Sequence, residues 1–356
     1  MNSRERVLSA VNHREPDRVP ITFDAEPVVY DLLYEHFGIN SRAALWDALH
    51  VDTWLEGPAV NDPRERQLDN GLFQNRWGYR IKPQPYTVGD KTGFYEEIVY
   101  YPLAEIKTAA ELDSYDWPQA DLLDFHHLNE LRREQPERAI IAHITHGGYF
   151  NATFLRGMEQ FLVDLALNTK LAEALVERTS SYLLSSLDRL LEQAPEGFDI
   201  FYLADDYCMD SGPLFSPEVF KRLIKPYLRQ ISDKVHQHGK KFLLHVCGSV
   251  RLLLPDIIDS GVDILEPIQR RVAGMDLESL KREYGKDLCF YGSVDLLQTL
   301  NKGTVEDVRN EVRRNIEILA PGGGFIIGPG HTYIQIDAPL ENILAMYETA
   351  YQEGGY

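Results

Sequence analysis

A histidine and a cysteine stand two residues apart at the end of an apolar run. Residues 242–244 are apolar and lead into His245 and Cys247, which Gly248 and Ser249 follow. Side chains two apart on an extended strand point to the same face, so His245 and Cys247 would project side by side. Imidazole nitrogen and thiolate sulfur both bind zinc, although two ligands do not complete a zinc site. The pair predicts a metal site; the alternative is a core strand with a buried cysteine and a hydrogen-bonded histidine.

Polar or metal-capable groups also end the other predicted strands. They are Asp24, His146, Asp205 with Asp206, Glu266, Asp295 and His331. In a barrel of alternating strands and helices, the carboxyl ends of the strands form the face where active sites lie. Asp also caps helices that begin just after strands, so Asp205 and Asp295 fit a capping role equally well. Adjacent residues face different ways, so we expect one of Asp205 and Asp206 to be a general acid or electrostatic partner and the other a cap.

Several further residues are candidates for the lining of a substrate pocket. Besides Asp24 and His146, they are Tyr149, Tyr207, Gln269 and Gln335. Asp205, Asp206 and Asp295 are the candidate catalytic carboxylates. His143 alternates away from the strand-end residues and is predicted to be a core or interface histidine.

The elements that would position these residues alternate between strand and helix. Seven strands are expected, over residues 21–24, 139–144, 199–204, 241–246, 262–265, 288–291 and 324–327. Strand then helix, repeated this often, favours parallel strands with right-handed crossovers. We therefore predict a single α/β domain over residues 1–356, a (β/α)8 TIM barrel whose eighth strand lies between residues 139 and 199. The alternative, a doubly wound sheet, lacks a Gly-rich phosphate fingerprint after its first strand.

An extension or insertion is expected beside the barrel, over about residues 28–135. It begins with helical segments and continues into a stretch rich in Gly, Pro and aromatic residues, in which alternating runs are typical of a β-hairpin. This stretch has too little apolar material for a core of its own, so we do not expect a second domain.

Composition excludes several classes of function. The net charge of −19 argues against a nucleic-acid partner, which needs basic surface to displace counterions. No apolar run approaches the roughly 20 residues of a membrane span, and residues 1–6 lack the apolar core of a signal peptide. The three cysteines are too few and too scattered for a disulfide framework. These patterns predict a soluble cytoplasmic protein with a small-molecule substrate.

The chain resembles the uroporphyrinogen decarboxylase superfamily, which contains the decarboxylase and zinc-dependent methylcobamide:thiol methyltransferases. The stretches that carry the resemblance are 13–20 (HREPDRVP), 204–206 (ADD), 216–218 (SPE), 225–226 (KP), 236–240 (HQHGK), 245–249 (HVCGS), 322–325 (GGGF) and 339–343 (PLENI). They extend over nearly the whole chain, and the His-x-Cys-Gly block is the most specific. The resemblance implies a TIM barrel, but the superfamily holds more than one chemistry.

Two departures from the superfamily patterns narrow the expected function. The decarboxylases carry an Arg-Gln-Ala-Gly-Arg signature for substrate carboxylates, whereas residues 21–27 here hold no Arg and two acids, which would repel uroporphyrinogen. The methyltransferases bind zinc through a His-x-Cys pair and a distant Cys. The pair matches His245 and Cys247, but the third position is His331. We expect zinc at these three residues, with Glu266 as a fourth ligand or displaced by substrate.

The resemblance therefore favours a zinc-dependent methyltransferase. It would move a methyl group between a methyl-corrinoid, free or on a partner corrinoid protein, or a small methylated donor, and a thiol-type acceptor. One alternative is a metal-independent decarboxylase of a small acid, with Asp205 or Asp206 as proton donor. Another is a non-catalytic barrel that binds a corrinoid or other ligand. A homodimer is also implied by the resemblance.

Overall fold

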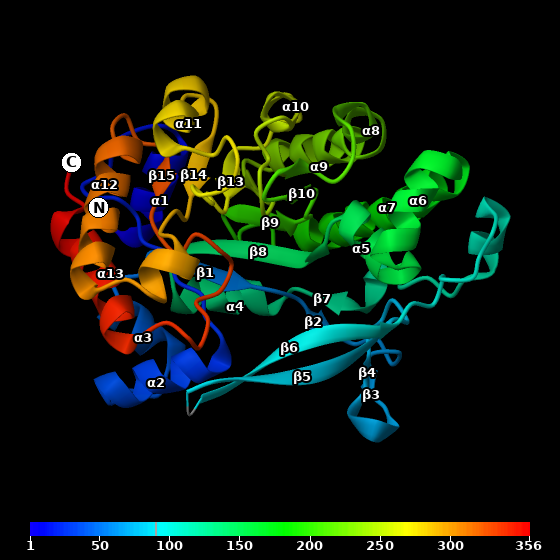
Figure 1. The fold of residues 1–356 in the computed structure, drawn as a ribbon, viewed down its shortest axis with the longest axis horizontal. Coiled ribbons are helices and arrows are strands. Elements are labelled where there is room, and N and C mark those ends of the chain that lie inside the picture. The colour runs from blue at the N-terminus through cyan, green and yellow to red at the C-terminus, as the bar shows by residue number, and fades with distance from the viewer. Residues whose placement is uncertain (90) are drawn as a thin grey trace.

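A parallel sheet curls around the centre of the molecule. The computed structural model describes residues 1–89 and 91–356. In this part of the chain the sheet has seven strands in the order β1-β8-β9-β12-β13-β14-β15, and each strand runs parallel to its neighbours (Figure 1). The bounds are Thr53–Glu56 (β1), Ala139–His146 (β8), Ile200–Ala204 (β9), Lys241–His245 (β12), Ile264–Glu266 (β13), Cys289–Tyr291 (β14) and Phe325–Ile326 (β15).

Residues 20–25 close the sheet into a barrel. Ile21 forms a parallel bridge with Ile327, which follows β15, and the Thr22 N–H donates to the Ile327 carbonyl at 2.9 Å. On the other side, the Asp52 N–H donates to the Ile21 carbonyl at 2.8 Å, directly before β1. The segment therefore joins both edge strands, which confirms the predicted TIM-barrel class. The strand that we expected over residues 21–24 is reduced to isolated bridges at Ile21 and Ala25.

The eighth strand is not where the sequence analysis placed it. Between β8 and β9 the chain forms helices, whereas the additional barrel strand is β1, inside the range that we assigned to the extension. β1 contains only four residues and ends before Gly57 and Pro58. A run this short shows no clear alternation, so its pattern could not distinguish a barrel strand from a strand of the hairpin region.

Helices surround the barrel and close its amino-terminal end. Val7 and Val11 of α1 pack against the interior residues Ile141, Leu243 and Ile264, so this helix covers the end opposite the strand termini. Asn2 and Glu5 form a capping box that starts α1. The α-helices are α1 (Ser3–Val11), α2 (Pro27–Phe37), α3 (Arg42–Ala48), α4 (His127–Glu134), α5 (Gly148–Arg156), α6 (Met158–Leu167), α7 (Thr169–Gln193), α8 (Pro217–Leu223), α9 (Lys225–Gln237), α10 (Leu254–Asp259), α11 (Leu277–Tyr284), α12 (Val305–Leu319) and α13 (Leu340–Glu353).

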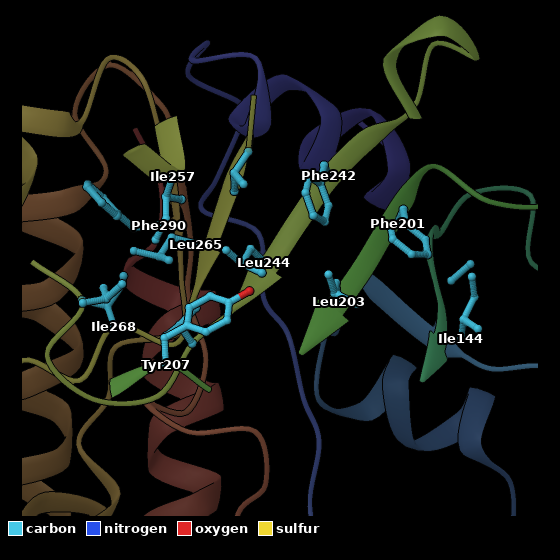
Figure 2. Close-up of a cluster of buried hydrophobic side chains, with 14 of the residues drawn as sticks. Ile144, Phe201, Leu203, Tyr207, Phe242, Leu244, Ile257, Leu265, Ile268 and Phe290 are labelled. Atoms are coloured by element: carbon cyan, nitrogen blue, oxygen red, sulfur yellow. The ribbon is translucent and has the colours of Figure 1, made fainter. Parts of the chain in front are cut away.

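The barrel strands are apolar on both faces. Phe201, Leu203, Phe242 and Leu244 belong to the cluster between the strands and the outer helices (Figure 2). Alternate residues, such as Leu243, belong to the separate cluster inside the barrel. Burial on both faces explains why these segments appear in the sequence as continuous apolar runs rather than alternating ones.

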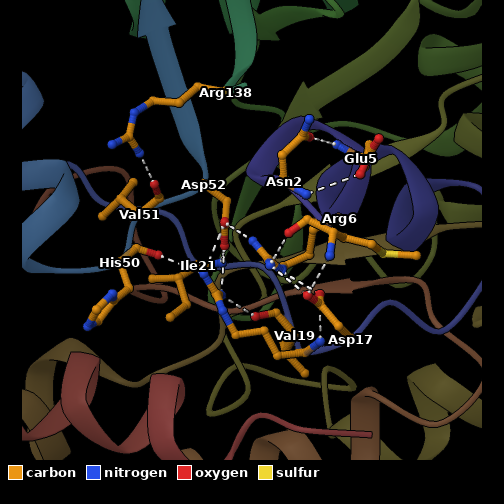
Figure 3. A network of polar contacts seen from close by, with 12 residues as sticks. Asn2, Glu5, Arg6, Asp17, Val19, Ile21, His50, Val51, Asp52 and Arg138 are labelled. Carbon is orange, nitrogen blue, oxygen red and sulfur yellow. Dashed lines mark hydrogen bonds and ion pairs between the residues drawn. The ribbon is translucent and has the colours of Figure 1, made fainter. Parts of the chain in front are cut away.

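Ion pairs fix the amino-terminal end of the barrel around Asp52, which is fully buried. Its carboxylate accepts from Arg6 Nη1 at 2.7 Å and from Arg18 Nη1 at 2.8 Å, and also from the Ile21 N–H at 2.8 Å. Arg6 also pairs with Asp17 (Figure 3). Asp52 therefore connects α1, the closing segment and the start of β1.

A long β-hairpin lies across the opposite end of the barrel. The Tyr86 hydroxyl donates to Glu26, and Lys91 Nζ donates to the Ile336 carbonyl at 3.3 Å, so the hairpin contacts α2 and the segment after β15 (Figure 1). The elements outside the barrel are β2 (Ala59–Val60), β3 (Arg66–Gln67), β4 (Phe73–Gln74), β5 (Arg80–Val88), β6 (Lys91–Tyr100), β7 (Leu123–Asp124), β10 (Cys208–Met209), β11 (Gly212–Pro213), the 3-10 helices η1 (Asp69–Gly71), η2 (Ala109–Ser114) and η3 (Ala120–Leu122), and the π-helix η4 (Leu296–Leu300).

The helices of the described residues include none with both the length and the apolar character needed to cross a lipid bilayer.

Candidate metal centre

His245 and Cys247 lie side by side at the carboxyl end of β12. Cys247 Sγ is 3.3 Å from His245 Nε2. Both residues line one cavity inside the mouth of the barrel. The imidazole is buried, with 4% of its residue surface exposed. The strand therefore presents a nitrogen and a sulfur donor to the same small volume.

Asp206 brings a third donor to this pair. Its Oδ1 accepts from the Cys247 N–H at 2.7 Å and lies 3.6 Å from His245 Nε2. Among the described residues, Asp206, His245 and Cys247 form a group whose ligand atoms all lie within 4.8 Å of one another. An imidazole, a thiolate and a carboxylate are the donors that zinc takes in proteins, and three such ligands leave a position open for a substrate.

Glu266 contacts the other nitrogen of the same histidine. Glu266 Oε2 is 2.8 Å from His245 Nδ1, and Thr332 Oγ1 is 3.4 Å from that nitrogen. A carboxylate on the far ring nitrogen fixes the tautomer and orientation of a metal-binding histidine. The structure thus places Glu266 behind His245, whereas we had expected it among the ligands.

His331 borders the group without belonging to it. Its interaction with Cys247 raises the pKa of the His331 imidazole, and His331 lines the same cavity. Its Nδ1 is buried and has no hydrogen-bond partner among the described residues. An unpaired buried nitrogen beside three metal-capable side chains fits a site that takes an ion.

Charge interactions favour the ionised form of this cluster. Burial raises the pKa of the Cys247 thiol, but hydrogen bonds from His245 and His331 outweigh burial and lower that pKa below its usual value. Burial lowers the pKa of His245, but the Glu266 carboxylate and the hydrogen bonds with Cys247 and Glu266 raise it well above its usual value. A thiolate beside a protonated imidazole is the state in which a cation can replace the proton.

Asp205 lies behind the strand end. Its Oδ1 accepts from the Phe150 N–H of α5 at 2.7 Å, and the Tyr207 hydroxyl donates to Oδ2 at 2.8 Å. Burial raises the pKa of Asp205 to about 7. The Tyr149 ring packs against the Tyr207 ring, with centroids 5.8 Å apart. In the described residues, Asp205, Tyr149 and Tyr207 are not among those that line the barrel cavity.

The cavity at the metal group has a volume of about 640 Å³ and extends toward the hairpin. His146 lines it, as predicted for a strand-end residue, and His143 lines it too. A register shift between His143 and His146 interrupts the alternation of β8, so both histidines face the cavity. From strict alternation we had expected His143 to be a core or interface histidine. No pattern in the sequence marks the bulge. Burial lowers the pKa of each imidazole to about 4, which makes both neutral at pH 7.

Asp24 lies deeper in the barrel, beside a small cavity of about 30 Å³ that Glu266 and His331 also line. The Tyr30 hydroxyl donates to Asp24 Oδ1 at 3.0 Å. Burial raises the pKa of Asp24 to about 6. Asp24 therefore shares a cavity with Glu266 and His331 but does not line the larger cavity at the metal group.

A further cavity, of about 360 Å³, borders His331 and contains the remaining predicted residues Gln269, Gln335 and Asp295. Gln269 Oε1 accepts from the Gly248 N–H at 2.6 Å, and its Nε2 lies 4.0 Å from Cys247 Sγ. Asp295 caps η4 and pairs with Arg271, so its carboxylate is occupied by structural contacts. Gln269 is thus the member of this group that lies next to Cys247.

A scan against protein-family models matches residues 100–352 to the family described as uroporphyrinogen decarboxylase (URO-D). The chain belongs to this family. The match includes every residue of the metal group together with Glu266 and His331.

The curated relatives are methyltransferases of Methanosarcina species. The chain is 25% identical over 218 residues to the methylated-thiol–coenzyme M methyltransferase of Methanosarcina mazei, which covers 61% of this chain and 54% of that protein. It is 26% identical over 199 residues to the methylcobamide:CoM methyltransferase MtaA of Methanosarcina barkeri. That match covers 55% of this chain and 53% of that protein. The chain spans about half the length of the curated relatives it matches.

Among solved structures, a methyltransferase from Methanosarcina mazei matches with a TM-score of 0.70 and 19% identity over 99% of each chain. This likeness confirms the fold along the whole chain.

Proposed function

We propose that this protein is a zinc-dependent methyltransferase that moves a methyl group from a methyl-corrinoid to a thiol. The observation that carries the proposal is the group of nitrogen, sulfur and oxygen donors at the mouth of the barrel. The names of the curated relatives, which are methylcobamide or methylated-thiol methyltransferases, support the choice of donor and acceptor. The corrinoid enters free or bound to a partner protein.

In this proposal Asp206, His245 and Cys247 hold the ion, and His331 borders its open side. Asp206 takes the place that we had expected for Glu266. A zinc ion, when bound, supplies positive charge that lowers the pKa of a thiol that coordinates it. Glu266 holds the Nδ1 side of His245, so Nε2 faces the ligand position.

In this proposal the cavity residues position the acceptor sulfur for the transfer. A carbon–sulfur bond forms while the carbon–cobalt bond of the methyl-corrinoid breaks, and the bonding electron pair stays on cobalt. The thiol proton leaves to solvent, because the neighbouring His143 and His146 are weak bases with a pKa of about 4. The thiolate is the nucleophile in such reactions, so its stabilisation is the main task of the site.

Transfer from methylcobalamin to 2-mercaptoethanol, followed by the absorbance change of the corrinoid, tests this function. We expect turnover by wild-type protein, loss of turnover on treatment with a zinc chelator, and recovery when zinc is returned. Cys247→Ser should abolish turnover without unfolding the barrel, while Cys208→Ser, outside the metal group, should retain it. Turnover that neither the chelator nor Cys247→Ser changes would contradict the proposal. Decarboxylation of a small acid that survives the chelator would favour the alternative enzyme class.

A further inference from the structure

The walls of the barrel cavity carry more negative than positive charge. Among the described residues that line it, Arg76 is the only guanidinium or ammonium group. The carboxylates that line it are Glu56, Glu65, Glu96 and Asp206. Arg76 is bound by Glu65 at 3.2 Å, and Glu56 is bound by Arg42 at 3.2 Å. Asp206 belongs to the metal group. Among the described residues that line the cavity, Glu96 is therefore the carboxylate with neither an arginine partner nor a place in the metal group.

Glu96 stands on β6 of the hairpin and faces the barrel. It shares a face of the strand with Ile98, which pairs with the cavity residue Ile81. Within the described part of the chain, its carboxylate makes no ion pair or side-chain hydrogen bond. It is also exposed, so it can meet a molecule that enters the cavity. A carboxylate at this position is available to a cation that enters the cavity.

Two phenol rings, those of Tyr79 and Tyr333, line the same cavity as Glu96. Burial raises the pKa of Tyr79, the Arg76 guanidinium partly offsets this rise, and the Glu96 carboxylate adds to it. Burial and the Glu96 carboxylate also contribute to the pKa of about 12 for Tyr333. Aromatic faces beside a carboxylate attract cations, because the ring quadrupole and the negative charge act in the same direction.

We propose that Glu96, with Tyr79 and Tyr333, receives a positively charged end of the acceptor, so the acceptor is an aminothiol rather than a thiol with an acidic tail. This inference rests on the proposed function, because it assumes that the acceptor sulfur binds at the metal group. Arg76 does not favour an anion here, since Glu65 already neutralises it. In this proposal the metal group binds the sulfur of the acceptor, and Glu96 binds its cationic end.

Three thiols that share a two-carbon chain and differ in the charge of the end group test the inference. They are 2-mercaptoethylamine, 2-mercaptoethanol and 2-mercaptoethanesulfonate, titrated calorimetrically into zinc-loaded protein. We expect the amine to bind about tenfold more tightly than the sulfonate, from one partly exposed ion pair and cation–π contacts. The thiols differ in their own pKa values, so the deciding quantity is the change in the affinity ratio that a substitution causes.

Two neighbouring substitutions supply that comparison. Glu96→Gln should reduce the amine-to-sulfonate ratio to about threefold or less. Glu97→Gln removes the same charge one residue along β6, on the face that pairs with Lys82 and contacts Gln84, and should leave the ratio unchanged. The inference is overturned if wild-type protein prefers the sulfonate or if both substitutions change the ratio equally. If none of the thiols binds to zinc-loaded protein, the proposed function itself fails.

Discussion

His245 is the residue on which the account of the site depends. Its Nδ1 contacts Glu266 at 2.8 Å, while its Nε2 faces Cys247 at 3.3 Å and Asp206 at 3.6 Å. The two ring nitrogens therefore have different neighbours. Nδ1 contacts the carboxylate that orients the ring, and Nε2 faces the position that an ion would take. This division assigns different roles to two carboxylates: Glu266 orients the imidazole ring, and Asp206 lies on the ligand side. The sequence alone could not distinguish these roles.

We predict that Glu266→Gln weakens zinc binding by about 10- to 100-fold, the usual effect of removing a carboxylate behind a metal-binding histidine. Competition with a chromophoric chelator measures the affinity. Glu283→Gln, a surface carboxylate of α11 paired with Arg251, is the matched control and should bind zinc as wild type does. Unchanged affinity in Glu266→Gln would contradict the orienting role, and complete loss of zinc would make Glu266 a direct ligand.

Asp24 should leave a signature in the pH dependence of stability. Burial raises its pKa from 3.8 to about 6 in the folded protein. Between these values the folded state binds the proton more readily than the unfolded state, so this group's contribution to stability falls as pH rises. The shift corresponds to a loss of up to about 3 kcal/mol from pH 4 to 6.

Urea denaturation at several pH values from 4 to 7 measures this effect. Compared with wild type, Asp24→Asn should lack the fall in the free energy of unfolding across that window. Asp31→Asn, an exposed residue of α2, should keep the wild-type curve. Parallel curves for wild type and Asp24→Asn would show that Asp24 does not titrate as described.

Among the elements, the short and irregular ones decide how the barrel closes and what enters its mouth. Residues 20–25 join the two edge strands through a few hydrogen bonds rather than a full ladder. β1 has four residues. The register shift in β8 turns His143 toward the cavity. Each of these features depends on partners distant in sequence, so local patterns do not specify it.

The seam between residues 20–25 and β1 should be stabilised mainly by Asp52. We predict that Asp52→Asn lowers the free energy of unfolding by about 3 kcal/mol, because Arg6 and Arg18 lose their buried counter-charge. Asp47→Asn is the control, because its carboxylate is exposed and pairs with Arg138, and it should cost less than about 1 kcal/mol. Urea denaturation measures both. Equal effects of the two substitutions would contradict the role of Asp52 in closure.

At the scale of the whole molecule, the two ends of the barrel have separate tasks. Helix α1 and the ion pairs of Figure 3 close the amino-terminal end. The opposite end gathers Asp206, His245, Cys247 and His331 from loops and strands far apart in sequence. Substitutions at the closed end should therefore change stability without changing the metal group.

The sequence predicted the architecture better than it predicted the roles of residues in the site. Strand-then-helix repetition was enough for the barrel, and the spacing of His245 and Cys247 was enough to place them together. The sequence could not show which of Asp205 and Asp206 enters the cavity, because that depends on the conformation of the loop after β9. Asp205 accepts a hydrogen bond from the Phe150 N–H, while Asp206 accepts one from the Cys247 N–H. Such contacts depend on the assembled barrel.

We propose that Asp206, His245 and Cys247 form a mononuclear zinc site. Elemental analysis of protein incubated with zinc and then freed of loosely bound ion tests it most directly, for wild type, Cys247→Ser and Cys208→Ser. We predict about one zinc per chain in wild type and in Cys208→Ser, and little or none in a folded Cys247→Ser. Wild-type protein that retains no zinc, or a Cys247→Ser variant that retains as much as wild type, would contradict the account.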